Sequence, residues 1–350
     1  PDAKQPGLKL LWQPPGSNPV ALSGAYLTPE LADLTLGDLP LPPAPPLLDS
    51  RLGNDAFALT QSTDLWQPQA RILPANLRAL PFENLWQVGN GCGSGVDQLN
   101  QPHGIALDGV RELIYVADTA NRRVQAYSLA GTLNAPLQSD LFQEPFDLAV
   151  TTDGALLVLD ATAQLILRRA PGEESFQPLP METSFYHPRG FTVDPMGTIS
   201  IADTGGGRVV MLAPTGQVLA EFGGPDTPLS KGQAVDVLAV SGGLWAVTAE
   251  DGRLWRLDNG GSLTVLPRVD TLNGPHLAGL PDGSFFLSDP ARRTVLYYAP
   301  TGEPRGQFAI SNAFVAPTGI AVAQIDEFVY LTAADSLACT LSSWRMPLAE

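Results

Sequence analysis

The chain has 350 residues, of which 44% are hydrophobic and only 16% are charged, and its formal net charge is −16 at pH 7. A surface this acidic repels phosphate backbones and anionic lipid headgroups, so we expect no binding to nucleic acid and no membrane insertion. The 34 glycines and 33 prolines favour short strands joined by tight turns, so the composition predicts an all-β fold.

Residues 1–76 form a proline-rich N-terminal extension that differs from the rest of the chain. Residues 39–47 read Leu-Pro-Leu-Pro-Pro-Ala-Pro-Pro-Leu, a composition that favours extended polyproline II. We interpret the extension as an irregular arm that packs on the chain's own folded domain, because its apolar residues need cover. An arm that docks on a neighbouring subunit is the alternative.

Residues 77–350 contain six copies of one pattern, spaced 43, 43, 46, 41 and 42 residues apart. The copies begin at Pro102, Pro145, Pro188, Ala234, Pro275 and Pro317. Most copies contain an apolar strand, a tight turn such as Asp-Pro-Met-Gly at 194–197, and further strands. Four antiparallel strands in about 43 residues correspond to one propeller blade. The spacing therefore predicts a six-bladed β-propeller with four-stranded antiparallel blades.

The sixth copy supplies only three strands, so the ring needs a strand from elsewhere. Segment 84–90 resembles the end of a fourth strand at 220–224, and we predict that it pairs with the last strand and closes blade six. Cys92 and Cys339 then lie on or beside neighbouring strands. Our estimate of the register places them several residues apart, beyond the reach of a disulfide bond, so we predict two free thiols and keep a bridge as the alternative.

Two copies carry a family resemblance. The sequences Pro-His-Gly-Ile-Ala-Leu-Asp at 102–108 and Tyr-Val-Ala-Asp-Thr-Ala-Asn-Arg-Arg-Val-Gln at 115–125 resemble the NHL-repeat consensus, as does 201–209 in the third copy. The second, fourth and sixth copies are degenerate. The resemblance extends over about residues 84–350 and implies a six-bladed β-propeller of the NHL-repeat kind.

An aspartate recurs at the end of the second strand of the repeat. Asp118 and Arg123 are five residues apart across a hairpin turn, and Asp203 and Arg208 have the same spacing. The carboxylate can accept N–H groups of the turn and pair with the arginine. We therefore predict a structural role for the whole series, which comprises Asp118, Asp160, Asp203 and Asp289.

The three histidines of the chain are the candidate metal ligands. His103, His187 and His276 occur where the innermost strands of copies one, three and five begin. Alternate blades of a six-bladed ring are about 120° apart, so three imidazoles could converge on the axis as an open His₃ zinc site. The set resembles that of the peptidyl-α-hydroxyglycine α-amidating lyases at His103 and His276, whereas His187 precedes its proline. We favour structural histidines and no cofactor, with zinc as the alternative.

We predict a non-catalytic protein-binding or structural module, since no recognised catalytic motif is present. Its end loops and N-terminal arm would contact a protein partner or further copies of the chain, in a larger bacterial or phage-tail-like assembly. The alternative is a metal-dependent lyase or hydrolase that uses the three histidines.

The expected location is the cytoplasm by default. We find neither a signal peptide nor an apolar run of 18 residues, and two cysteines are too few for a disulfide framework. Membership of an assembly, or secretion after processing, stays open.

Overall fold

The computed structural model describes residues 77–241, 243–257, 261–265 and 274–348, together with two short strands near the N-terminus. The chain divides into two compact units, Pro1–Ala70 and Arg71–Glu350. In the first unit, β1 (Leu11–Trp12) pairs antiparallel with β2 (Val20–Ala21). The predicted polyproline segment and the contacts of the arm lie outside the described residues. No described helix is both long and apolar enough to cross a membrane.

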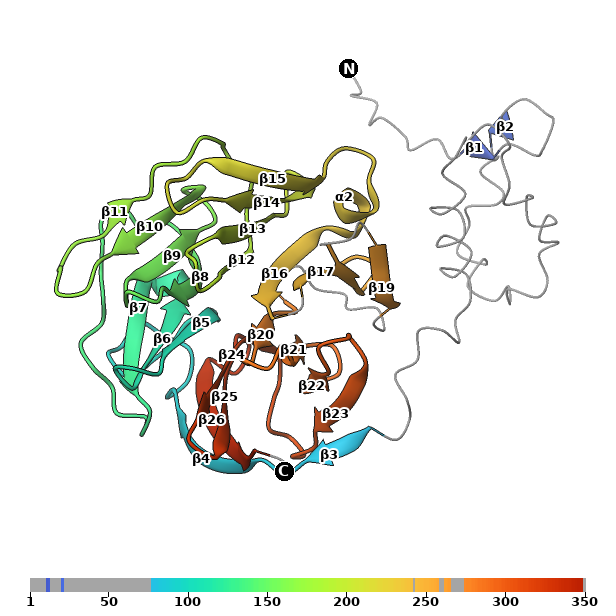
Figure 1. Ribbon diagram of the computed structural model, residues 1–350. Coiled ribbons are helices and arrows are strands. Elements are labelled where there is room, and N and C mark those ends of the chain that lie inside the picture. The colour runs from blue at the N-terminus through green and yellow to red at the C-terminus, as the bar shows by residue number, and fades with distance from the viewer. Residues whose placement is uncertain are drawn as a thin grey trace, which may run out of the picture. The chain divides into compact units, whose positions relative to one another are not determined.

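The second unit is a six-bladed β-propeller, as the sequence predicted, with the first strand of each blade nearest the axis (Figure 1). Blade one contains β5 (Pro102–Asp108), β6 (Leu113–Asp118) and β7 (Arg123–Ser128), and blade two contains β8 (Pro145–Val150), β9 (Leu156–Asp160), β10 (Leu165–Arg169) and β11 (Gln177–Pro178). Blade three contains β12 (Gly190–Val193), β13 (Ile199–Asp203), β14 (Arg208–Leu212) and β15 (Val218–Gly223), and blade four contains β16 (Ala234–Val240), β17 (Gly243–Thr248), β18 (Arg253–Arg256) and β19 (Gly261–Val265). Blade five contains β20 (Leu277–Gly279), β21 (Phe285–Asp289), β22 (Thr294–Tyr298) and β23 (Pro304–Phe308), and blade six contains β24 (Pro317–Ile325), β25 (Phe328–Asp335) and β26 (Thr340–Pro347).

Two short helices lie in loops of the described part of the propeller. They are the 3₁₀ helix η4 (Thr119–Asn121) and α2 (Pro228–Gly232). Blade one has three named strands instead of the predicted four. The loop that follows β7 takes the place of its outer strand through isolated bridges from Val124 to Leu137 and from Tyr127 to Leu133.

The hydrophobic core lies between the blades. Six clusters of buried apolar residues occur in the described part of the chain, one at each contact between adjacent blades. Strand β9 is buried at every position, because neighbouring blades cover both of its faces. Outer strand β15 alternates between half-buried and exposed positions. Each sheet is thus stabilised by its two neighbours, so the ring must close to bury all six interfaces.

The ring closes through an N-terminal strand, as the sequence predicted. Strand β4 (Glu83–Val88) pairs antiparallel with β26 as the outer strand of blade six, with Val88 opposite Leu341. Strand β3 (Arg78–Leu80), which the sequence did not predict, pairs parallel with β23 as a fifth strand of blade five. Residues 78–88 therefore run along the outside of blades five and six, and appear in cyan beside the red strands in Figure 1.

The prediction of two free thiols is wrong. Cys92 and Cys339 form a disulfide bond with their Cα atoms 5.1 Å apart. If the β4–β26 ladder continued in extended conformation, Asn90 would lie opposite Cys339, and Cys92 would lie two residues beyond it, out of reach of a disulfide bond. The chain does not continue in this way, because Gly89, Gly91 and Cys339 have positive φ angles of 108°, 76° and 55°. These residues turn the chain and bring Cys92 back. A Cβ atom at residue 89 would lie 2.4 Å from the Cys339 carbonyl oxygen, so this approach requires glycine.

Candidate functional site

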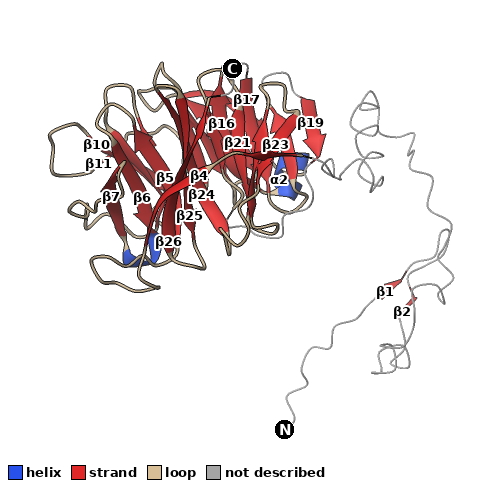
Figure 2. Cartoon of the chain, turned by 90° about the horizontal axis from the view of Figure 1, so that it is seen from below, coloured by secondary structure: helices blue, strands red, loops and turns tan. Residues whose placement is uncertain are grey.

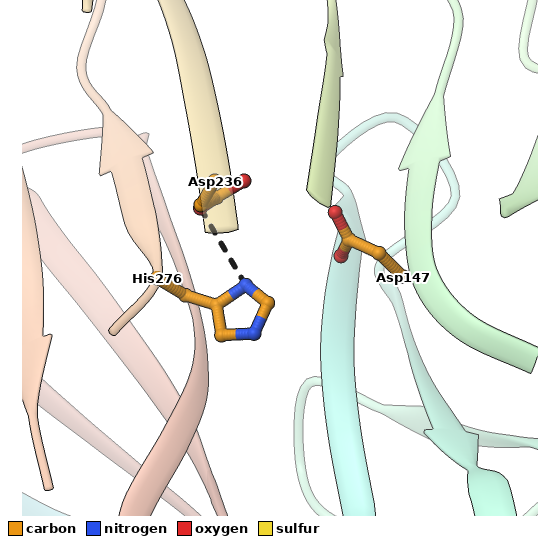
Figure 3. A group of neighbouring side chains, drawn as sticks. All are labelled: Asp147, Asp236 and His276. Atoms are coloured by element: carbon orange, nitrogen blue, oxygen red, sulfur yellow. Dashed lines mark ion pairs between the residues drawn. The ribbon is translucent and has the colours of Figure 1, made fainter. Parts of the chain in front are cut away.

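The innermost strands surround an axial cavity of about 170 Å³. Three of the residues that line it are titratable: Asp147 on β8, Asp236 on β16 and His276 just before β20. All three are buried, and their potential ligand atoms lie within 4.8 Å of one another. Figure 3 shows the three side chains converging from separate strands. We call this group the axial cluster.

The repeat explains how two carboxylates reach the axis. The third position of the six copies is occupied by Gly104, Asp147, Gly190, Asp236, Leu277 and Gly319. A Cβ atom at Gly104 would lie 2.1 Å from Asp147 Oδ1, and one at Gly190 would lie 2.1 Å from Asp236 Oδ1. Each aspartate therefore occupies space that the glycine of the preceding blade leaves free. Glycine in one copy and aspartate in the next is a signal that the sequence carries.

The two carboxylates also join adjacent blades. Asp147 accepts hydrogen bonds from the N–H of Leu148 (2.9 Å) and, in blade three, from the N–H of Phe191 (2.9 Å). Asp236 accepts from the N–H of Val237 (2.8 Å) and, in blade five, from the N–H of Leu277 (2.6 Å). The axial cluster thus holds the inner strands of four blades in position, and each carboxylate keeps unused lone pairs.

The electrostatics of the axial cluster favour a positive charge. Burial and the nearby Asp236 carboxylate together raise the pKa of Asp147 to about 7. Burial alone would lower the pKa of His276, but its hydrogen bond to Asp236 and the charges of Asp236 and Asp147 outweigh this and raise the pKa. His276 Nδ1 lies 3.5 Å from Asp236 Oδ2. An added proton or cation would relieve the repulsion between the carboxylates.

Only one of the three histidines predicted from the sequence joins the axial cluster. His276 does so, whereas His187 is exposed, has a φ angle of 47° and packs against Tyr186 with ring centroids 4.7 Å apart. His103 is buried and stacks on Phe146 at 4.4 Å. Among the described residues, the potential metal ligands that the fold brings together are His276 and two aspartates, Asp147 and Asp236. His103 and His187 are not part of this group.

His103 is held as a neutral imidazole. Its Nδ1–H donates to the carbonyl oxygen of Gln101 at 2.8 Å, since a carbonyl only accepts. Burial, together with the charges of His276 and Arg189, lowers its pKa to about 3. The Arg189 guanidinium lies 4.5 Å from the centre of the Phe146 ring. These side chains pack together where the inner strands begin.

The predicted ion pairs of Asp118 and Asp203 are present, whereas their backbone N–H donors, Asn100 and Tyr186, precede the first strand of the blade instead of lying in the hairpin turn. Asp118 accepts from Arg123 Nε at 2.6 Å and from the N–H of Asn100 at 2.7 Å. Asp203 pairs with Arg208 at 2.9 Å. Asp160 accepts from backbone N–H groups, and Asp289 pairs with Arg292. All four carboxylates are buried at the ends of second strands, where they tie turns to the ring.

Most of the large exposed apolar side chains of the described chain lie at one end of the ring, the end at which the inner strands begin. We call this end the entry face and the opposite end the exit face; both are fringed by loops in Figure 2. Six of the ten large exposed hydrophobic residues of the described chain lie in loops of the entry face: Val96, Leu141, Tyr186, Ile310, Val315 and Leu337. These loops belong to blades six, one, two and three, which are consecutive around the ring.

Comparison with known proteins supports the fold. The NHL-repeat family model matches residues 99–127. Selenomethionine-substituted virginiamycin B lyase from Staphylococcus aureus is 14% identical with a TM-score of 0.52, over 76% of this chain and 99% of that chain. A streptogramin B lyase is 16% identical with a TM-score of 0.51, over 77% of this chain and 88% of that chain. A putative gluconolactonase is 14% identical with a TM-score of 0.55, over 80% and 96%. The comparison with curated proteins found no match.

Proposed function

We propose, from the premise that this chain is an NHL-repeat six-bladed β-propeller, that it is a non-catalytic protein-binding module of a larger assembly. The observation that carries the proposal is the set of exposed apolar residues on the entry face. Leu337, Val96 and Tyr186 have 70%, 67% and 58% of their surface exposed. A concentration of exposed apolar side chains on one face favours protein association there, and tyrosine is enriched in interfaces.

The charges beside these residues indicate the chemistry of the partner. Exposed Asp97 follows Val96, and exposed Asp140 precedes Leu141. A partner with an apolar centre and a basic rim would complement this arrangement. The axial cavity, at about 170 Å³, is too small to hold a polypeptide segment with its side chains. This supports an outer surface as the binding site, and the exposed apolar residues favour the loops of the entry face.

Site-specific photo-crosslinking tests the proposal. A photoreactive residue at position 141 or 186 should crosslink to the same partner protein in the source cells. The matched controls are positions 110 and 196 on the exit face, whose residues Val110 and Met196 are 92% and 85% exposed. Crosslinks of equal yield from both faces, or from the exit face alone, would contradict the proposal.

A metal-dependent lyase or hydrolase is the second candidate, and the axial cluster is the observation that favours it. The similar solved structures include lyases and a putative gluconolactonase, but their identities of 14–16% support only the fold. Loss of a measured activity in Asp147→Asn, with the partner crosslink at position 141 intact, would favour this candidate over the binding module.

The disulfide bond bears on location. Disulfides persist in oxidising compartments and are rare in the cytosol. The Cys92–Cys339 bond therefore supports an extracytoplasmic or otherwise oxidising location over the cytoplasm that the sequence suggested by default. Fractionation of source cells with detection of the protein would test this inference.

A further inference from the structure

We propose that Asp147, Asp236 and His276 form a binding site for one divalent first-row transition-metal ion, with Zn²⁺ as the representative ion, in the wall of the axial cavity. This inference is independent of protein binding at the entry face. The ligands come from blades two, four and five, and so differ from the three-histidine set that the sequence suggested.

The geometry is close to what a metal needs. Tetrahedral zinc with bonds of about 2.0–2.1 Å places its ligand atoms about 3.3 Å apart. His276 Nδ1 and Asp236 Oδ2 are already 3.5 Å apart, and all three ligand atoms lie within 4.8 Å of one another. In Figure 3 the Asp147 carboxylate faces His276 across a short gap. Small side-chain rotations would bring the three atoms onto one ion.

A bound cation would compensate the charge of the axial cluster. Two carboxylates and one imidazole are each at least 94% buried, and two neighbouring carboxylates repel each other strongly when they are shielded from water. Their bonds to backbone N–H groups fix their position but use only two of the approximately four lone-pair directions of each carboxylate. The remaining lone pairs can bind a cation without loss of the contacts between blades.

The donor set indicates the class of ion. One imidazole nitrogen and two carboxylate oxygens suit Zn²⁺ or Mn²⁺, whereas Ca²⁺ and Mg²⁺ prefer oxygen ligands alone. Three protein ligands also leave a coordination position open. That position would face the axial cavity, which has room for a water molecule or a small ligand.

Metal titration tests the site directly. The full chain, purified without a histidine tag and stripped with a chelator, is titrated with Zn²⁺ against a chromophoric competitor. We expect one ion per chain, and at least about a 100-fold loss of affinity in His276→Gln, because one of three ligands is removed. His187→Gln is the matched control, since His187 is exposed and outside the cluster, and its affinity should equal that of the parent.

A second variant protects the test against misfolding. Asp147→Asn keeps an oxygen acceptor but lowers the ligand charge, and it should weaken zinc binding about 10-fold or more while circular dichroism stays unchanged. Three outcomes would overturn the proposal: no zinc uptake at micromolar concentration, uptake that both variants retain, or uptake that is lost in His187→Gln.

Discussion

At the scale of single residues, His103 gives the propeller a dependence on pH. Burial lowers its pKa to about 3 from 6.5. Below pH 6.5 the unfolded chain takes up a proton that the folded chain does not bind until about pH 3. Stability is therefore fully present above pH 6.5 and falls on acidification, by about 1.4 kcal/mol for each pH unit.

The variant His103→Asn isolates this effect. Asparagine can still donate an N–H to the carbonyl of Gln101, but it does not titrate. The pKa values of Asp147 and His276 are raised as well, so both groups add to the pH dependence. The quantity to compare is therefore the loss of unfolding free energy between pH 6.5 and pH 4.5, measured by denaturant unfolding in the parent and in the variant. The parent should lose about 2–3 kcal/mol more than the variant. Equal losses would show that His103 is protonated in the folded chain.

The residues of the axial cluster were only partly predictable. The sequence placed His276 at the entry of an inner strand, where it lies. The alternation of glycine and aspartate at the third position of the repeat was the signal for Asp147 and Asp236, but interpreting it requires knowing that each aspartate fills the space above a glycine of the preceding blade. His187 was counted with the other two, but it precedes its proline and its positive φ directs it outward.

At the scale of elements, Trp86 anchors the closing strand β4. Its Nε1–H donates to the carbonyl oxygen of Leu129 at 2.7 Å, and its ring stacks on Tyr127 in blade one. Trp86→Ala should lower the free energy of unfolding by about 3 kcal/mol, since it removes this packing and the hydrogen bond. Gln87→Ala, at an exposed position of the same strand, is the control and should change it by less than about 0.5 kcal/mol. Chemical denaturation measures both; equal effects would contradict the anchoring role.

Most strands were predictable because the repeat recurs six times, and the exceptions have local causes. Strand β3 has only three residues, Arg-Ala-Leu, and pairs in parallel with β23. It is too short to show the alternation of apolar and polar residues by which a strand is recognised in a sequence. The outer position of blade one is held by isolated bridges to Leu133 and Leu137 instead of a ladder. The closing strand was visible because it resembles the fourth strands of other blades.

At the scale of the whole molecule, two devices close the ring: the β4–β26 ladder and the Cys92–Cys339 bond. The cysteines are separated by 247 residues, so the bond constrains nearly all of the propeller in the unfolded state. Its reduction should lower the free energy of unfolding by about 4 kcal/mol. The ladder remains, so the reduced protein should stay folded.

Urea unfolding with and without reductant measures this effect, and the double variant Cys92→Ser/Cys339→Ser serves as the control that no longer responds to reductant. Peptide mapping without reduction should give one linked pair of cysteines. Two titratable thiols in the folded, unreduced protein would contradict the closure described here. The sequence could not settle this point, because the positive φ angles that bring Cys92 back are not evident from ladder register alone.

The central claim is that the entry face of the closed ring binds a protein partner. Amide hydrogen exchange of the propeller, free and in complex with the partner identified by crosslinking, tests it most directly. We predict slower exchange in the loops around Leu141, Tyr186 and Val315, with no change around Val110 and Met196. Slower exchange confined to the exit face would contradict the claim.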